Sequence, residues 1–211
     1  MELLTSMYTY IAENIQAYRI QMLSHIGICL LCLAVCCVAA IPLAYMCVRY
    51  KKYQNSVVSV VQILRIIPSL AILILLIPIL GTGVKPAAAA LILLAFPPVL
   101  MNAIDGFHDV SDITLENAFA MGMNSREVFW KVHLPLAMPK IFIGIKIAAI
   151  ELISSATLAA KIGAGGLGEI IFTGLGLNRT DMLLVGALSV ALLAALMSMV
   201  LQLTEKLLVH R

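Results

Sequence analysis

Charged residues are scarce in this chain of 211 residues. They make up 12% of it, whereas 62% of the residues are hydrophobic; a soluble domain carries about 25% charged residues. So little polar surface excludes a water-exposed globule, and membrane lipid is the expected surrounding. The formal net charge of +3 is too small to indicate a nucleic-acid partner, and none is expected.

Sequence features for redox, metal or phosphate chemistry are also scarce. All five cysteines fall between Cys29 and Cys47, in an apolar run that contains no histidine. Thiolates are costly to bury in hydrocarbon, so the C-x-x-C of Cys29 and Cys32 favours small apolar filler over a redox or zinc site. No phosphate-binding P-loop sequence is present. The chain is therefore expected to bind no metal and no cofactor of its own.

Long apolar runs, by contrast, are abundant. A membrane-spanning helix needs about 20 such residues, and five segments qualify: 26–48, 57–80, 86–104, 141–160 and 182–203. The predicted fold class is an all-α membrane protein with five transmembrane helices, in which residues 23–211 form a single transmembrane domain. Residues 1–22 show no cleavable signal peptide and are expected to form an amphipathic helix on the external membrane surface.

The basic residues of the loops predict the orientation of the chain. With five spans, the two termini lie on opposite sides of the membrane. One set of loops holds few basic residues, namely Arg19, Lys85, Lys161 and Arg179. The other set holds Arg49, Lys51, Lys52, Arg126, Lys131, Lys140, Lys206 and Arg211. The richer set is predicted to be cytoplasmic, which places the N-terminus outside a bacterial cell membrane and the C-terminus inside.

The glycine-rich stretch GAGGLGEII has the spacing G-x-G-x-x-G at Gly163, Gly165 and Gly168. In dinucleotide-binding enzymes this motif requires a strand before it and a helix after it. Here it follows a predicted membrane helix on the external side, which argues against a nucleotide site. These glycines and Gly166 are instead expected to let backbones pack closely, or to let a short helix turn back into the membrane.

The predicted cytoplasmic loop 105–140 is far longer than a tight connection requires. Ser111 or Asp112 is predicted to cap a first helix that runs through Ala120, and Gly122 then breaks it. A second helix is predicted to be capped at 124–125, and Pro135 is expected to end it. Together these features indicate a compact unit that projects from the membrane.

The same loop carries more apolar surface than a solvated connection needs. Its apolar side chains are Leu115, Ala118, Phe119, Phe129, Trp130, Val132 and Leu134. Trp130 is the only tryptophan of the chain, and tryptophan is enriched at protein interfaces. The loop is therefore predicted to be a docking surface.

This loop resembles the EAA loop of the permease subunits of ATP-binding-cassette importers, which runs E-A-A, three residues, glycine, and ends in L-P. The residues that fit the pattern are Glu116, Ala118, Gly122, Leu134 and Pro135, while Asn117 replaces the first alanine. The segments RIIPSLAILILLIPILGTGVKPA, GMNSREVFWKVHLPLAMPKIFIGIKIA and ATLAAKIGAGGLGEIIFTGL look like the membrane subunits of glycine betaine, carnitine and choline importers. The resemblance runs from residue 23 to the C-terminus.

The resemblance implies a type I importer permease fold and a non-catalytic role, in which the chain forms the path for a quaternary ammonium compatible solute. ATP and Mg²⁺ would bind a separate ATP-binding cassette ATPase subunit. A second permease subunit, identical or related, would face this chain, and an extracellular substrate-binding protein would deliver the solute. The ATPase-coupling residues are expected to be Glu116, Ala118, Gly122, Trp130, Leu134 and Pro135. The path or gate residues are expected to be Arg65, Pro68, Ser69, Glu151, Gly163, Gly165, Gly166 and Gly168.

Three charged side chains fall inside the predicted spans. Arg65 and Lys146 lie roughly 12 Å from the cytoplasmic ends of their spans, and both are long enough to reach the interface. Glu151 lies near the middle of the bilayer, where a carboxylate needs a partner on another helix, a water-lined cavity or a proton. It could attract a quaternary ammonium solute along the path, or it could be structural.

Two other functions stay open on the sequence. An intramembrane enzyme using Glu151, His25, Ser154 or Ser155 is disfavoured, because helix packing and interfacial anchoring explain these side chains. A permease for another small solute, such as an amino acid, would share the coupling loop and differ only in the delivered ligand.

Overall fold

A computed structural model describes residues 2–209, and all its regular elements in that range are helical. The helices are α1 (Glu2–Glu13), α2 (Ile15–Arg49), α3 (Lys51–Ile66), α4 (Ser69–Leu80), α5 (Val84–His108), α6 (Asp112–Ala120), α7 (Ser125–Val128), α8 (Leu134–Ala159), α9 (Leu167–Gly176) and α10 (Thr180–Val209). A π-helical turn, Phe129–His133, joins α7 to α8, and a 3₁₀ turn, Ala160–Ile162, follows α8.

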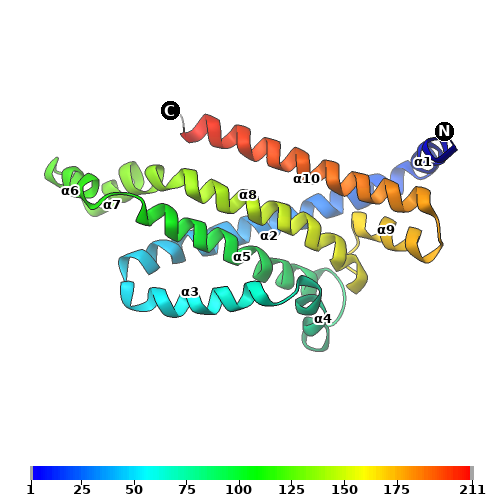
Figure 1. Cartoon of the computed structure of the whole chain (residues 1–211), viewed down its shortest axis with the longest axis horizontal. Helices are drawn as coiled ribbons and strands as arrows, with labels where there is room; N and C mark the ends of the chain where they lie inside the picture. Colours follow the sequence, from blue (N-terminus) through cyan, green and yellow to red (C-terminus); the bar gives the residue numbers. More distant parts are fainter. Residues whose placement is uncertain (1, 210–211) are drawn as a thin grey trace.

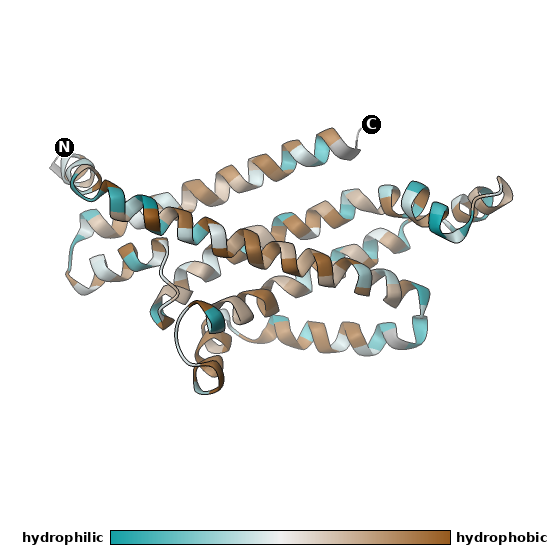
Figure 2. Ribbon diagram, turned by 180° about the vertical axis from the view of Figure 1, so that it is seen from behind, coloured by the Kyte–Doolittle hydropathy of each residue, from teal (hydrophilic) through white to brown (hydrophobic). Residues whose placement is uncertain are grey.

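The long helices run side by side, so that the loops gather at two ends (Figure 1). The α2–α3 turn, α6, α7 and the end of α10 lie at one end, and α1 and α9 lie at the other. Hydrophobic residues predominate along the middle of the long helices, and hydrophilic residues gather toward the two ends (Figure 2). The two predicted loop sets therefore lie at opposite ends; Arg211, one member of the basic set, is outside the described residues.

Four helices are long and apolar enough to cross a membrane: α2, α5, the continuous segment Ser125–Ile162, and α10. The bent pair α3 and α4 makes a fifth candidate. The expectation of one continuous second span over 57–80 is wrong, because the chain turns by 98° between α3 and α4. Pro68 explains the break: it lacks an N–H and disfavours helical backbone at Ile67, which adopts φ −76° and ψ 124°.

The expected surface helix over residues 1–22 also needs correction. The chain breaks earlier, at Asn14, and residues 15–22 belong to the first long helix. The helix before the break packs against the start of α10, where the Arg179 guanidinium lies 5.6 Å from the centre of the Tyr10 ring. The Tyr18 hydroxyl lies 2.7 Å from the Ser189 Oγ, a hydrogen bond that joins α2 to α10.

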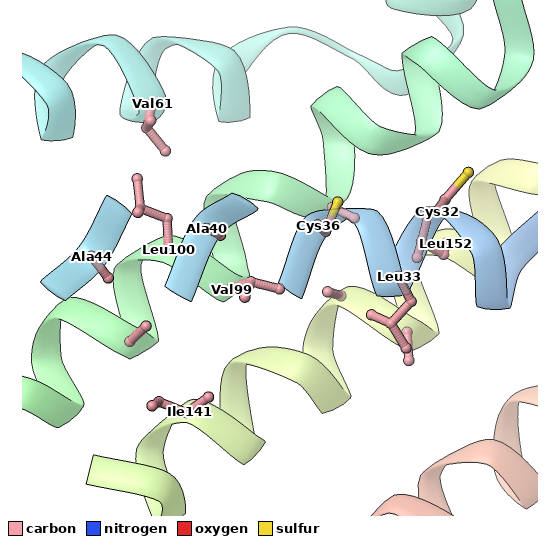
Figure 3. Close-up of a cluster of buried hydrophobic side chains, with 14 of the residues drawn as sticks. Cys32, Leu33, Cys36, Ala40, Ala44, Val61, Val99, Leu100, Ile141 and Leu152 are labelled. Carbon is pink, nitrogen blue, oxygen red and sulfur yellow. The ribbon is translucent and has the colours of Figure 1, made fainter. Parts of the chain in front are cut away.

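The core lies where α2, α5 and α8 meet (Figure 3). Small side chains at every fourth position of α2, namely Cys32, Cys36, Ala40 and Ala44, are all buried. Small residues let neighbouring helices approach closely in a membrane. The Cys36 thiol donates to the Ile92 carbonyl of α5 at 3.3 Å. The cysteine run thus packs the core, as the sequence predicts.

Helices α5 and α8 approach each other at backbone level through two glycines. A Cβ at Gly144 would lie 2.7 Å from the Pro98 carbonyl oxygen, and one at Gly106 would lie 2.7 Å from the Ala137 carbonyl oxygen. Both distances are shorter than a methyl group tolerates. The spacing of these two helices therefore depends on the absence of side chains at the two positions.

We expect Gly144→Ala to destabilise the protein by about 1–3 kcal/mol, because the added methyl group must push α8 away from α5. The measurement is the thermal unfolding midpoint of the purified subunit in detergent. Gly27→Ala in α2 is the matched control, since a Cβ there meets nothing within 4 Å, and it should leave the midpoint unchanged or slightly raised. Equal midpoints for the two variants would contradict the close-approach interpretation.

Candidate functional site

The first candidate site is the coupling segment, which we define as residues 111–135. The Ser111 hydroxyl accepts a hydrogen bond from the Thr114 amide at 3.3 Å and caps α6. At the other end of α6, Gly122 has φ +85°, and its amide donates to the Phe119 carbonyl at 2.9 Å. The Met123 amide reaches back to the Ala118 carbonyl at 3.3 Å, which completes a Schellman motif. The predicted glycine break is thus a defined turn.

The second helix of the segment also begins as predicted. The Asn124 side chain accepts hydrogen bonds from the amides of Arg126 and Glu127, and the Glu127 carboxylate accepts one from the Asn124 amide, which forms a capping box. That amide hydrogen bond, and the Lys131 ammonium 3.0 Å from the carboxylate, hold the pKa of Glu127 below its usual value. The start of α7 is therefore fixed by local hydrogen bonds.

The prediction that Pro135 ends this second helix is wrong. Helix α7 runs through the π-helical turn into α8, and Pro135 occupies the first turn of α8. A proline ring clashes with the carbonyl four residues earlier in a regular helix, and a wider π-helical turn relieves that clash. The coupling segment is consequently continuous with a membrane helix over residues 125–162.

Aromatic side chains anchor the coupling segment to the core. The ring of Tyr45 on α2 lies 4.5 Å from Phe129 and 5.5 Å from Phe107, measured between centroids. The buried His133 Nε2 lies 3.1 Å from the Phe107 carbonyl and donates to it. The Lys140 ammonium lies 2.6 Å from the Asp109 carboxylate and ties α8 to the end of α5. Sequence reasoning missed these contacts, since the partners are far apart in the chain.

The outer face of the coupling segment carries several large, exposed apolar side chains. Ile113, Phe119, Met121 and Trp130 expose 69%, 49%, 71% and 59% of their surfaces. The predicted coupling residues therefore divide by position. Glu116, Gly122, Trp130 and Pro135 are exposed, whereas Ala118 is buried and Leu134 packs against the core.

The second candidate site is a cavity of about 360 Å³ at the break between α3 and α4, which we call the break cavity. Its lining comprises Leu64, Arg65, Ile66, Ile67, Pro68, Ser69, Leu94, Glu151, Ser154 and Ser155. Four of the predicted path residues, Arg65, Pro68, Ser69 and Glu151, thus share one cavity although they come from three different helices or their connection. The sequence motif around Pro68 and the isolated Glu151 were the only signals of this site.

Glu151 is half-buried in this cavity and Arg65 is exposed. Among the side chains that the structure describes, no ion pair joins either residue to another. The sequence leaves Glu151 with a partner on another helix, a water-lined cavity or a proton. The structure places it in a cavity whose lining includes polar side chains.

Lys146 differs from both of these residues. Its ammonium lies 3.3 Å from the Glu205 carboxylate of α10, and both side chains are largely buried. Glu205 lies near the C-terminal end of α10. Lys146 therefore links α8 to α10, which is a structural role. No feature of the sequence indicates that Glu205 is its partner.

The four glycines of the predicted path lie in a separate place: Gly163, Gly165 and Gly166 come just before α9, and Gly168 is in its first turn. Gly163, Gly165 and Gly166 all have positive φ, at +85°, +73° and +80°. A Cβ at Gly166 would lie 2.9 Å from His25 Nδ1, and one at Gly168 would meet the Thr157 carbonyl oxygen. The stretch is flanked by helices on both sides, so it permits close backbone packing and a short apolar helix, α9. The predicted gate role of these glycines stays a prediction.

Comparisons with known proteins agree with this arrangement. The family described as "Binding-protein-dependent transport system inner membrane component" matches residues 37–211. The chain is 37% identical over 203 residues to the glycine betaine/carnitine/choline transport system permease protein OpuCB of Bacillus subtilis, which covers 96% of this chain and 94% of that protein. It is 40% identical over 182 residues to the choline transport system permease protein OpuBB of the same organism, covering 86% and 84%.

Solved structures show the same fold. An inward-facing structure of the MetNI methionine ABC transporter has a TM-score of 0.80 at 22% identity, covering 93% of this chain and 98% of that one. An amino acid ABC transporter crystallised with histidines has a TM-score of 0.75 at 17% identity, covering 94% and 97%. The predicted all-helical permease fold of type I importers is thereby confirmed. This chain belongs to the binding-protein-dependent transport system inner membrane component family, as a multi-pass permease subunit of the ATP-binding-cassette importers.

Proposed function

We propose that this permease forms the translocation path of an ATP-driven importer for a quaternary ammonium compatible solute: glycine betaine, carnitine or choline. The observation that carries the proposal is the combination of 37–40% identity to permeases named for these solutes with an intramembrane carboxylate, Glu151, in a cavity. A carboxylate without an ion-pair partner attracts a cation in a medium of low dielectric constant.

An amino acid is the less favoured solute. The structural neighbours named for methionine and amino acids are at most 22% identical to this chain, and similarity at that level supports the fold alone. The two Bacillus subtilis relatives at 37% and 40% identity are named for glycine betaine, carnitine and choline. The names of these sequence relatives therefore favour a quaternary ammonium solute over an amino acid.

The partners follow from the two candidate sites. A separate ATP-binding cassette ATPase would bind ATP and Mg²⁺ and receive the exposed apolar face of the coupling segment. Because this segment continues into α8, movement of the ATPase would tilt the helix that carries Glu151. A second permease, identical or related, would complete the path, and an external substrate-binding protein would deliver the solute. The chain itself would catalyse no reaction.

Glu151→Gln should lower uptake of glycine betaine roughly tenfold, which corresponds to ~1.4 kcal/mol, because the substitution removes the charge and keeps the shape. The measurement is ATP-dependent uptake into proteoliposomes that contain the assembled importer, at saturating substrate-binding protein. Glu13→Gln, at an exposed position of α1, is the control and should transport normally. Normal uptake by Glu151→Gln would remove its role in the path, and failure of the complex to assemble would make the role structural.

Gly122→Val should uncouple the permease, because valine at φ +85° is strained by about 1–3 kcal/mol and reshapes the turn that presents the outer face. Solute-stimulated ATP hydrolysis and uptake should both fall at least about tenfold, while the substrate-binding protein still binds its ligand. Gly122→Asn is the matched control, since asparagine tolerates this backbone region, and it should retain most activity. Full coupling in Gly122→Val would show that this turn does not transmit the movement.

The predicted orientation, with the N-terminus outside, is tested by labelling. A cysteine at Thr82, exposed between α4 and α5, should react with a membrane-impermeant maleimide in whole cells. A cysteine at Asn55, exposed near the start of α3, should react only after the membrane is opened. The unsubstituted chain gives the background from its native cysteines. The reverse pattern would invert the orientation.

A further inference from the structure

The break cavity contains two opposite charges that belong to different helices. Arg65 lies near the end of α3, and Glu151 lies in the middle of α8. Both line the same cavity, together with the hydroxyl-bearing Ser69, Ser154 and Ser155. Its volume of about 360 Å³ falls at the small end of the range for ligand cavities, roughly 300–1,000 Å³.

These two charges are not used to hold helices together. Where this chain links membrane helices through charges, the groups are in direct contact, as in the 3.3 Å pair of Lys146 and Glu205. Arg65 and Glu151 line one cavity, but no contact within 4.0 Å joins their charged groups among the described side chains. Within residues 2–209, Glu151 is half-buried without an ion-pair partner, which is costly inside a membrane protein. The guanidinium of Arg65 is exposed and likewise unpaired in that range, so the cavity offers charges of both signs to a bound solute.

The backbone around Arg65 adds to the positive side of the cavity. Helix α4 begins at Ser69, directly after the break, and Ser69 lines the cavity. The first amides of a helix carry partial positive charge, and half-helix N-termini in transporters point at anionic groups of substrates. Arg65 and the start of α4 thus flank the break, and Glu151 reaches the same cavity from α8.

We propose that the break cavity selects zwitterionic quaternary ammonium solutes: Glu151 faces the trimethylammonium end, and Arg65 with the start of α4 binds the carboxylate end. This inference rests on the proposed function and narrows it. Glycine betaine and carnitine carry both charged groups, whereas choline carries only the cation. The permease itself therefore favours the carboxylate-bearing solutes over choline, in addition to any selection by the substrate-binding protein.

The test compares two solutes in one assembled importer. Uptake of glycine betaine and of choline is measured in proteoliposomes, each at a concentration that saturates the substrate-binding protein. Arg65→Gln should lower glycine betaine uptake about tenfold, as for loss of a hydrogen bond to a charged group, and should change choline uptake less than about twofold. Glu151→Gln should lower both. Arg19→Gln, at an exposed position of α2 outside the cavity, is the matched control and should change neither.

The other outcomes overturn the inference. Equal losses for both solutes in Arg65→Gln would make Arg65 a structural anchor, and unchanged uptake of both would remove it from the path. Should Arg65→Gln fail to assemble, Arg65→Lys decides: a loss confined to glycine betaine supports the inference, and equal losses overturn it. Failure of the proposed function gives a different result, since the unsubstituted importer would then take up none of glycine betaine, carnitine and choline.

Discussion

The close approach of α5 and α8 is the constraint on which the rest of the structure depends. Gly106 and Gly144 leave no room for a methyl group between the two backbones. Because α5 packs against α2 on its other side, this contact places three long helices in one core. The coupling segment is fastened to the same core, since His133 donates to the Phe107 carbonyl and Lys140 pairs with Asp109.

Helix α8 connects the two candidate sites. Through the π-helical turn it is continuous with α7 of the coupling segment, in one helical segment from Ser125 to Ile162, and it carries Glu151 into the break cavity. A movement imposed on the exposed apolar face at one end would therefore displace a charged group of the path at the other. Pro68 contributes in a different way: by breaking the span between α3 and α4, it opens the cavity in which Arg65 and Glu151 lie near each other.

Local signals predicted the elements whose causes are local. The caps at Ser111 and Asn124 and the turn at Gly122 are determined by neighbouring residues, and each lies where the sequence places it. One helix was expected to continue past Pro68 and another to end at Pro135, and the structure shows the reverse at both positions. The apolar run around Pro68 hides a broken helix, and a π-helical turn keeps the helix at Pro135 intact. Contacts such as Lys146 with Glu205 join residues 59 positions apart, and no local pattern reveals them.

The central claim is that the coupling segment and the helix that carries Glu151 move as one rigid body. Spin labels at Arg126 and Ile147, both exposed, are 21 residues apart along the continuous helix, or about 30 Å at 1.5 Å per residue. Double electron–electron resonance measures this distance directly. The assembled importer is compared without nucleotide and with ATP bound. An unchanged distance within the chain, together with a changed distance from Ile147 to a label on the second permease subunit, is the predicted result. A changed distance within the chain would contradict the claim, because the coupling segment would then bend away from α8 instead of moving it.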